Sequence, residues 1–229
     1  MPVSMFSDPT MLLLIPALLL SLWAQVKVKS TFARYSKVDA ASGMTGSEVA
    51  RRLLKDGGLD DVEVESVEGN LTDHYDPRSR KLRLSASTSQ SKSVAALGVA
   101  AHEVGHAIQH QKAYGAFQLR QGVFPVANLG STLAFPLFIA GLLFSIPSLM
   151  TIGILLFSGA VAFQVITLPV EFNASSRALA LLGSRGYLVQ EEVGHARKVL
   201  QAAALTYVAA TAMAVLQLFR LLMLRSRRD

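Results

Sequence analysis

The chain has no cysteine, which excludes disulfide bonds and thiolate metal sites and fits a reducing compartment. It also has no charged residue or histidine from residue 121 to residue 170. A bilayer core takes roughly twenty apolar residues per helical crossing, so this run predicts two crossings. With 51% hydrophobic residues and a positive mean hydropathy, the sequence predicts a membrane protein rather than a soluble one.

A break in the uncharged run lies at "SIPS", residues 145–148. Pro147 between two serines favours a tight turn and interrupts the helical pattern. The sequence therefore predicts a transmembrane helical hairpin over residues 123–168, with its helices at about 123–144 and 149–168.

Two further apolar runs flank the middle of the chain. No lysine or arginine precedes "PTMLLLIPALLLSLWAQV", residues 9–26, and no small-x-small cleavage site is evident, so we expect an uncleaved transmembrane anchor rather than a signal peptide. The last run, residues 199–224, is long enough to cross but rich in alanine and threonine. We expect it to cross, although an interfacial position would keep the "RSRRD" tail beside the other basic segments.

The basic residues indicate orientation. Of the 22 lysines and arginines, fourteen lie in residues 27–120 and four in residues 169–198, whereas the hairpin turn has none. Because positive residues stay on the cytoplasmic side, both segments should be cytoplasmic, with the N-terminus and the turn outside. The net charge of +6 is accounted for by anionic lipid, and no nucleic-acid partner is expected, because no basic motif with interleaved aromatics occurs.

The segment 27–120 has the pattern of a small mixed module. A Thr45 or Ser47 cap, an apolar stripe and Gly57-Gly58 predict a helix over about 45–56. Alternation predicts strands in "DVEVESVEG" and "KLRLSAS", with "DHYDPRSR" as the turn between them. The expected fold is therefore mostly α and membrane-embedded, a helical transmembrane bundle with a small α+β cytoplasmic module.

A metal motif occurs on the next predicted helix, which begins after Ser93. In "AAHEVGHAIQ", His102 and His106 are one helical turn apart, so both imidazoles can reach one zinc ion while Glu103 serves as catalytic base. The alternative, a helix with one buried histidine and a solvated glutamate, makes no use of this spacing. His110 lies about 12 Å along the axis from His102, too far for a shared zinc ion, so the third ligand must come from elsewhere.

Glu171 is the first charged residue after the hairpin, in "LPVEFNASSRAL". Two crossings return the chain to the side of the HExxH helix, so this carboxylate is the candidate third ligand of a site that keeps its fourth position open. The plainer alternative is an ordinary interfacial charge. His195 stands in a second "EVGHA" on the same cytoplasmic segment. It either stabilises an oxyanion or is a surface histidine.

"AAHEVGHAIQ", the apolar hairpin and "LPVEFNASSRALALL" together resemble the YugP-like family of bacterial membrane-bound neutral zinc metallopeptidases. They resemble more distantly the HtpX-type membrane proteases. The resemblance runs almost end to end and implies a gluzincin-type peptidase of the bacterial inner membrane. It assigns His102, His106 and Glu171 as zinc ligands and Glu103 as catalytic base.

One departure from the family pattern concerns the partners of the zinc-binding imidazoles. The family has an aspartate where this chain has Asn173, and related gluzincins have one where it has Ser175. The candidates for a residue that supports the site without binding the metal are therefore Asn173, Ser175 and His195. A neutral partner raises imidazole basicity less than a carboxylate does, so metal affinity is the property that this departure affects.

The expected function is zinc-dependent hydrolysis of peptide bonds at the cytoplasmic membrane face, with peptides or membrane proteins as substrates. A partner subunit or an oligomer would be compatible with the sequence. Substrates should bind as extended strands, with "KLRLSAS" as the candidate sheet edge. The main alternative is an inactive zinc-stabilised scaffold, which would not need Glu103. A transporter is disfavoured because the hairpin offers few polar groups.

Overall fold

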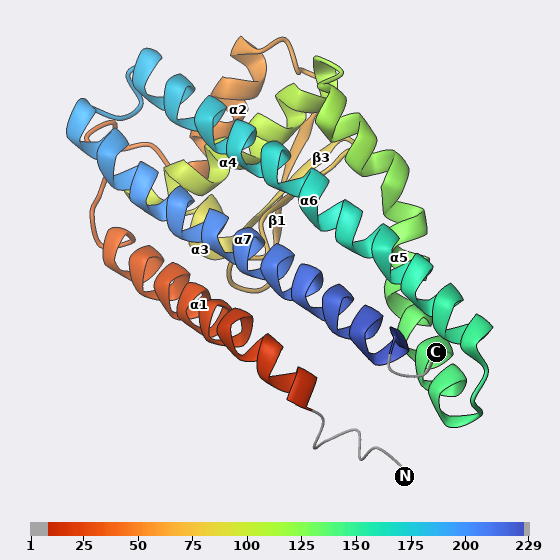
Figure 1. Ribbon diagram of the computed structural model, residues 1–229. Helices are drawn as coiled ribbons and strands as arrows, with labels where there is room; N and C mark the ends of the chain where they lie inside the picture. The colour runs from red at the N-terminus through yellow and green to blue at the C-terminus, as the bar shows by residue number, and fades with distance from the viewer. Residues whose placement is uncertain (1–8, 227–229) are drawn as a thin grey trace. The chain divides into compact units, whose positions relative to one another are not determined.

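The computed structural model describes residues 9–226, and its chain divides into two compact units. One unit comprises the apolar stretches, residues up to Gln25 together with Leu119–Leu168 and the chain from Thr206 onward. The other comprises Val26–Gln118 and Pro169–Leu205. Figure 1 labels the helices and strands that pass through these units. The predicted outer position of the N-terminus concerns residues outside the described part of the chain.

Four helices of the described chain are long and apolar enough to cross a membrane. The first span is formed by η1 (Pro9–Leu14) and α1 (Ile15–Tyr35). The other three are α5 (Gly115–Leu143), α6 (Pro147–Ser184) and α7 (Gln190–Ser226). The predicted anchor, hairpin and last apolar helix are thus all helical. However, α6 continues unbroken past residue 168 into the segment that was expected to be separate.

In the apolar unit, α5 and α6 form the predicted hairpin. Their crossing is close, because a Cβ added to Gly130 would lie 2.4 Å from the backbone oxygen of Leu156. Glycine at such a point lets two membrane helices approach. Phe138, Met150 and Phe157 form a buried cluster between them.

The last apolar run, α7, packs along this hairpin. The hydroxyl of Thr211 donates to the backbone oxygen of Gln164 at 3.3 Å, and Leu221 lies in the same buried cluster as Met150, near the hairpin turn. α7 therefore runs antiparallel to α6 through the whole apolar unit. Its C-terminal end lies at the same end of that unit as the hairpin turn, which favours a full crossing over an interfacial position.

The second unit contains the mixed module. α2 (Gly46–Asp56) is capped by Thr45, one of the two predicted candidates, in a capping box in which Thr45 and Glu48 each accept the other's backbone N–H. The three-stranded sheet has the order β1-β3-β2, formed by β1 (Glu63–Val67), β2 (His74–Asp76) and β3 (Lys81–Ser85). The expectation that "DHYDPRSR" is only a turn was wrong, because its first half pairs antiparallel with β3 and only the residues that follow Asp76 turn.

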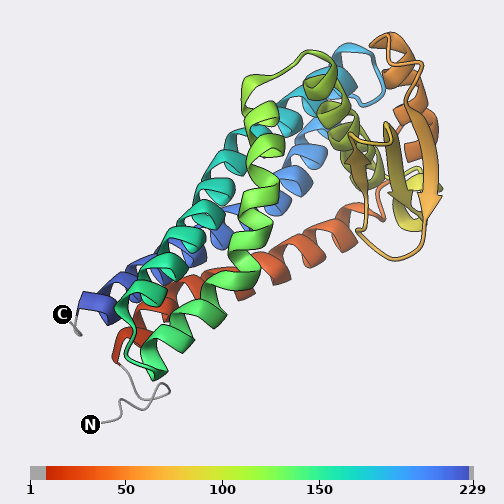
Figure 2. The same ribbon diagram turned by 90° about the vertical axis from the view of Figure 1, so that its right-hand side faces the viewer.

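The core of this unit lies between the sheet and its helices. A short helix, α3 (Ala86–Ser89), leads into α4 (Val94–Gln111). In Figure 2 the sheet, in orange and yellow, lies beside the yellow-green α4. Leu53, Leu82, Leu97 and Leu182 are fully buried in one apolar cluster to which α2, β3, α4 and α6 all contribute. The metal motif on α4 is therefore part of a packed helix rather than of a loop.

Candidate metal centre

The helix that carries the HExxH motif, α4, begins where the sequence predicted, after Ser93. Ser93 caps α4 by accepting the backbone N–H of Ala96 at 3.2 Å, and the alanine-rich sequence that follows contains no proline. His102 and His106 project from successive turns, with ring centres 4.7 Å apart and planes nearly perpendicular. His106 is 8% exposed, so its imidazole is set by packing before any metal binds.

Glu171 reaches the two imidazoles from α6. Its Oε2 lies 3.2 Å from Nε2 of His102 and 3.6 Å from Nε2 of His106. The ligand atoms of the three residues all lie within 4.8 Å of one another. Two imidazole nitrogens and one carboxylate oxygen are the donor set of many catalytic zinc sites, which keep a fourth position open. These residues therefore fit zinc, and they are the three that the sequence brought forward as ligands.

Glu103 points from α4 toward the sheet. The backbone N–H of Tyr75 in β2 donates to its Oε2 at 3.0 Å. Burial raises the pKa of Glu103 to about 7 in the metal-free protein, and the neighbouring His102 partly opposes that shift. A carboxyl group with a pKa near neutrality is suited to accept and return a proton at physiological pH.

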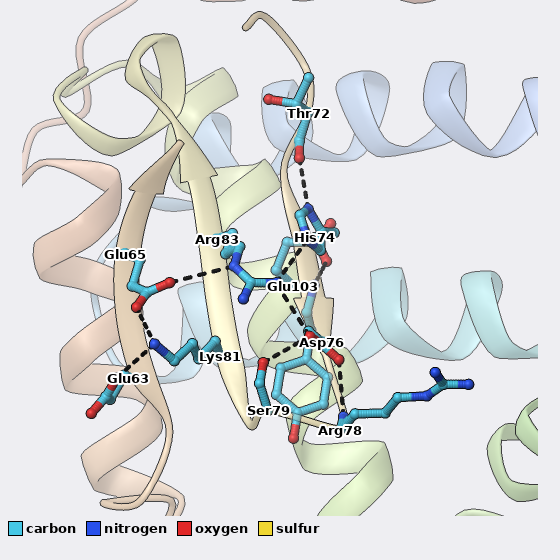
Figure 3. A network of polar contacts seen from close by, with 11 residues as sticks. Glu63, Glu65, Thr72, His74, Asp76, Arg78, Ser79, Lys81, Arg83 and Glu103 are labelled. Atoms are coloured by element: carbon cyan, nitrogen blue, oxygen red, sulfur yellow. Dashed lines mark hydrogen bonds and ion pairs between the residues drawn. The ribbon is translucent and has the colours of Figure 1, made fainter. Parts of the chain in front are cut away.

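The outer face of the sheet carries alternating charges, which Figure 3 shows together with Glu103. Lys81 pairs with Glu65, and Arg83 pairs with Asp76 at 3.2 Å. Such cross-strand pairs favour one strand register. Because β3 lies between β1 and β2, the expectation that its segment "KLRLSAS" offers a free edge was wrong. The sheet edge beside the HExxH helix belongs to β2.

Each of the two imidazoles that face Glu171 has a polar partner on its other nitrogen. The Ser175 hydroxyl lies 3.1 Å from Nδ1 of His102, and Oε1 of Gln109 lies 3.0 Å from Nδ1 of His106. Within residues 9–226, Asn173 hydrogen-bonds neither imidazole. Its Oδ1 accepts from Gln109 and from Arg177 instead.

Gln109 was missed in the sequence. It is fully buried and stands three residues after His106, on the same face of the helix. An amide in this position beside a metal-binding histidine is the signal that could have identified it.

The two other histidines considered for this site lie apart from the ligand group. His110 Nδ1 is 2.9 Å from the Tyr75 hydroxyl, and its ring packs beside Phe117. His195 stacks on Tyr35 with ring centres 4.9 Å apart. Neither belongs to the three-residue group that the described chain offers to a metal ion.

Known proteins resemble this chain over most of its length. Residues 10–226 match a family described as "Putative neutral zinc metallopeptidase". The chain belongs to this family. A curated relative from Bacillus subtilis (strain 168), "Putative membrane protease YugP", is 55% identical over 212 residues, which cover 93% of this chain and 94% of the relative. No solved structure matches the chain.

Membership fixes several properties that the sequence indicated. The chain is a membrane member of a zinc metallopeptidase family, with four candidate spans in its described part. Zinc is the family's metal, and His102, His106 and Glu171 form a group that could hold it.

Proposed function

We propose that this protein is a membrane-bound zinc endopeptidase that cleaves peptide bonds at the cytoplasmic membrane face. The observation that carries the proposal is the convergence of three ligand atoms within 4.8 Å from two helices, with the Glu103 carboxyl beside them on α4. The family match and the membrane protease relative support it.

His102, His106 and Glu171 would hold the zinc ion through two imidazole nitrogens and one carboxylate oxygen. Bound zinc supplies Lewis acidity, which polarises a peptide carbonyl and makes water acidic enough to react near neutral pH. Glu171 is 2% exposed and the two imidazoles are partly or fully buried. The ligand set is therefore largely shielded from bulk water, and electrostatic interactions within it are strong.

Glu103 is the proposed general base. Its Oε1 or Oε2 takes the proton from the attacking water and then delivers it to the nitrogen of the leaving amine. The Tyr75 N–H, 3.0 Å from Oε2, orients the carboxylate and ties it to β2. Glu103 is thus placed by the sheet as well as by its own helix.

The outer edge of β2 is the proposed docking strand for an extended substrate. The Tyr75 N–H on this edge already donates to Glu103, so a peptide would pair through the other backbone groups of the edge and would lie beside the proposed general base. Backbone pairing of this kind supplies affinity with little dependence on sequence. We therefore expect substrates to be unfolded or extended segments, including segments of membrane proteins.

We propose that the site lies near the membrane surface, because Glu171 in α6 is the first charged residue after the uncharged run of residues 121–170. Because the basic residues flank the metal motif on both polar segments, the positive-inside rule favours the cytoplasmic face for the site.

The deciding experiment combines metal analysis of the purified protein with cleavage of an unfolded protein substrate, with and without a chelator. Glu103→Gln should retain about one zinc ion per chain and lose at least about a hundredfold in cleavage rate, because the general base is gone. Zinc without any cleavage in the unaltered protein would favour a scaffold. Undiminished cleavage by the Glu103→Gln variant would remove the proposed mechanism.

A further inference from the structure

We propose that Gln109 is a positioning residue that fixes the tautomer and ring orientation of His106, and that Asn173 and Arg177 fix Gln109 in turn. The inference rests on the proposed zinc site and extends it beyond the three ligands. It is carried by a continuous series of hydrogen bonds. One end of the series is the Val170 carbonyl oxygen, which can only accept, and the other is the Arg177 guanidinium, which can only donate.

The backbone oxygen of Val170 determines one end of the series. A carbonyl oxygen can only accept a hydrogen bond, and the atom 2.8 Å from it is Nε2 of Gln109. The amide nitrogen of Gln109 must therefore face α6. Its second hydrogen is directed to Oδ1 of Asn173 at 3.0 Å, so both donors of this amide are used.

Arg177 determines the other end. Its guanidinium can only donate, and Nε lies 2.7 Å from the Asn173 side-chain atom that also faces Gln109. That atom must be the oxygen, which settles the orientation of the Asn173 amide. Asn173 accepts two hydrogen bonds there, so its neutral side chain fills an acceptor role that an aspartate could also fill.

The consequence reaches His106. Because the amide nitrogen of Gln109 faces α6, its Oε1 faces Nδ1 of His106 at 3.0 Å. An amide oxygen only accepts, so Nδ1 must carry the proton. In the neutral imidazole the lone pair is then on Nε2, the nitrogen that faces Glu171. The hydrogen-bond series therefore holds His106 in the tautomer that can bind a metal.

Burial makes this arrangement rigid. Gln109 is fully buried and His106 is 8% exposed, so water does not offer the Gln109 amide or the His106 imidazole a competing partner. Gln109 also joins α4 to α6 through its bonds to Val170 and Asn173, and α6 carries Glu171. The same side chain thus orients one ligand and ties its helix to the helix of another.

The test measures zinc affinity by competition with a chromophoric chelator, and the visible spectrum of the Co²⁺-substituted protein. Gln109→Met should lower zinc affinity about 10- to 100-fold, as loss of a ligand's hydrogen-bond partner typically does, and should shift the Co²⁺ bands. The matched control is Gln111→Met. Gln111 lies on the same helix but donates to Gly57 and Gly58, so its loss should leave zinc affinity and spectrum unchanged.

A second pair of variants guards against a folding defect in Gln109→Met. Asn173→Asp keeps an acceptor for Gln109 and Arg177 and should retain zinc affinity, whereas Asn173→Leu should lose it. Equal affinity in these two variants, or unaltered affinity and spectrum in Gln109→Met, would overturn the assignment of Gln109. Failure of the unaltered protein to bind zinc would instead refute the proposed function.

Discussion

Gly105 and Ala174 lie at a close approach of α4 to α6. A Cβ added to Gly105 would lie 2.7 Å from the backbone oxygen of Ala174 and 3.1 Å from its Cα. Both neighbours are backbone atoms, which cannot move without shifting a helix. Gly105 stands next to His106 on α4, the helix of the two histidines, and Ala174 stands three residues after Glu171 on α6. The distance between the two helices at this point therefore controls whether the three ligand atoms converge.

Gly105→Ala should therefore destabilise the protein and weaken zinc binding. Alanine gains about 1 kcal/mol in helix propensity, but overpacking a close contact typically costs about 1–3 kcal/mol, and the helices can relieve it only by separating. Thermal unfolding and zinc affinity would measure both effects. Gly98→Ala is the control on the same helix, because its Cβ would meet the Ala196 Cβ at an ordinary 3.4 Å. If Gly105→Ala and Gly98→Ala had the same thermal stability and the same zinc affinity, the spacing of α4 and α6 at Gly105 would not be critical.

Glu171→Gln tests the third ligand. The change keeps the side-chain size but removes the charge and weakens the oxygen donor, so zinc affinity should fall by more than the roughly 10- to 100-fold typical of a partner outside the ligand set, and cleavage should be lost. His110→Ala should keep one zinc ion per chain, because His110 bonds Tyr75 instead. Metal analysis that found the opposite pattern would mean that the ligand set is different.

The packing of α7 extends the topology prediction to the C-terminus. Cysteines introduced singly at Ser79 and Ser184, both exposed, should be shielded from a membrane-impermeant thiol reagent in intact cells. Cysteines at Ser148 and Ser226 should both react, because α7 ends beside the hairpin turn. The cysteine-free chain needs no prior substitution. Labelling of the cysteine at Ser79 but not of the one at Ser184 would put the two polar segments on opposite sides of the membrane. That result would contradict a site shared by both segments.

Asp76 should make the sheet sensitive to acid. Hydrogen bonds from the Ser79 hydroxyl, the Arg78 backbone and Arg83 lower its pKa to about 2. Because the folded pKa is below the unfolded one, its stabilisation is present above about pH 4 and is lost as the pH falls toward 2. Asp76→Asn should therefore cost about 1 kcal/mol at neutral pH, allowing for solvent screening, and much less at pH 2, where the carboxyl is partly protonated in the folded protein.

Urea unfolding in detergent at several pH values would measure this difference. Asp60→Asn, at an exposed position in the turn before β1, is the matched control and should cost little at any pH. If the cost of Asp76→Asn were constant from pH 7 to pH 2, the carboxylate would not be the stabilising group.

The sequence by itself determined the parts of this protein that depend on local pattern. Fifty residues without a charge require membrane crossings wherever they fold. The spacing of His102 and His106 places both on one helical face, and the Ser93 cap marks where a helix begins. Each of these follows from periodicity or end chemistry within a few residues.

Only the tertiary structure decided which distant groups meet. Gln109 and Val170 are separated by 61 residues, and His102 and Ser175 by 73. No local rule states that Gln109 rather than Asn173 faces an imidazole, that β3 is central and β2 is the edge, or that α7 packs along α6. These outcomes depend on how whole helices and strands pack, because burial is gained over entire faces, and the polar partners are then chosen among the groups that packing brings within reach.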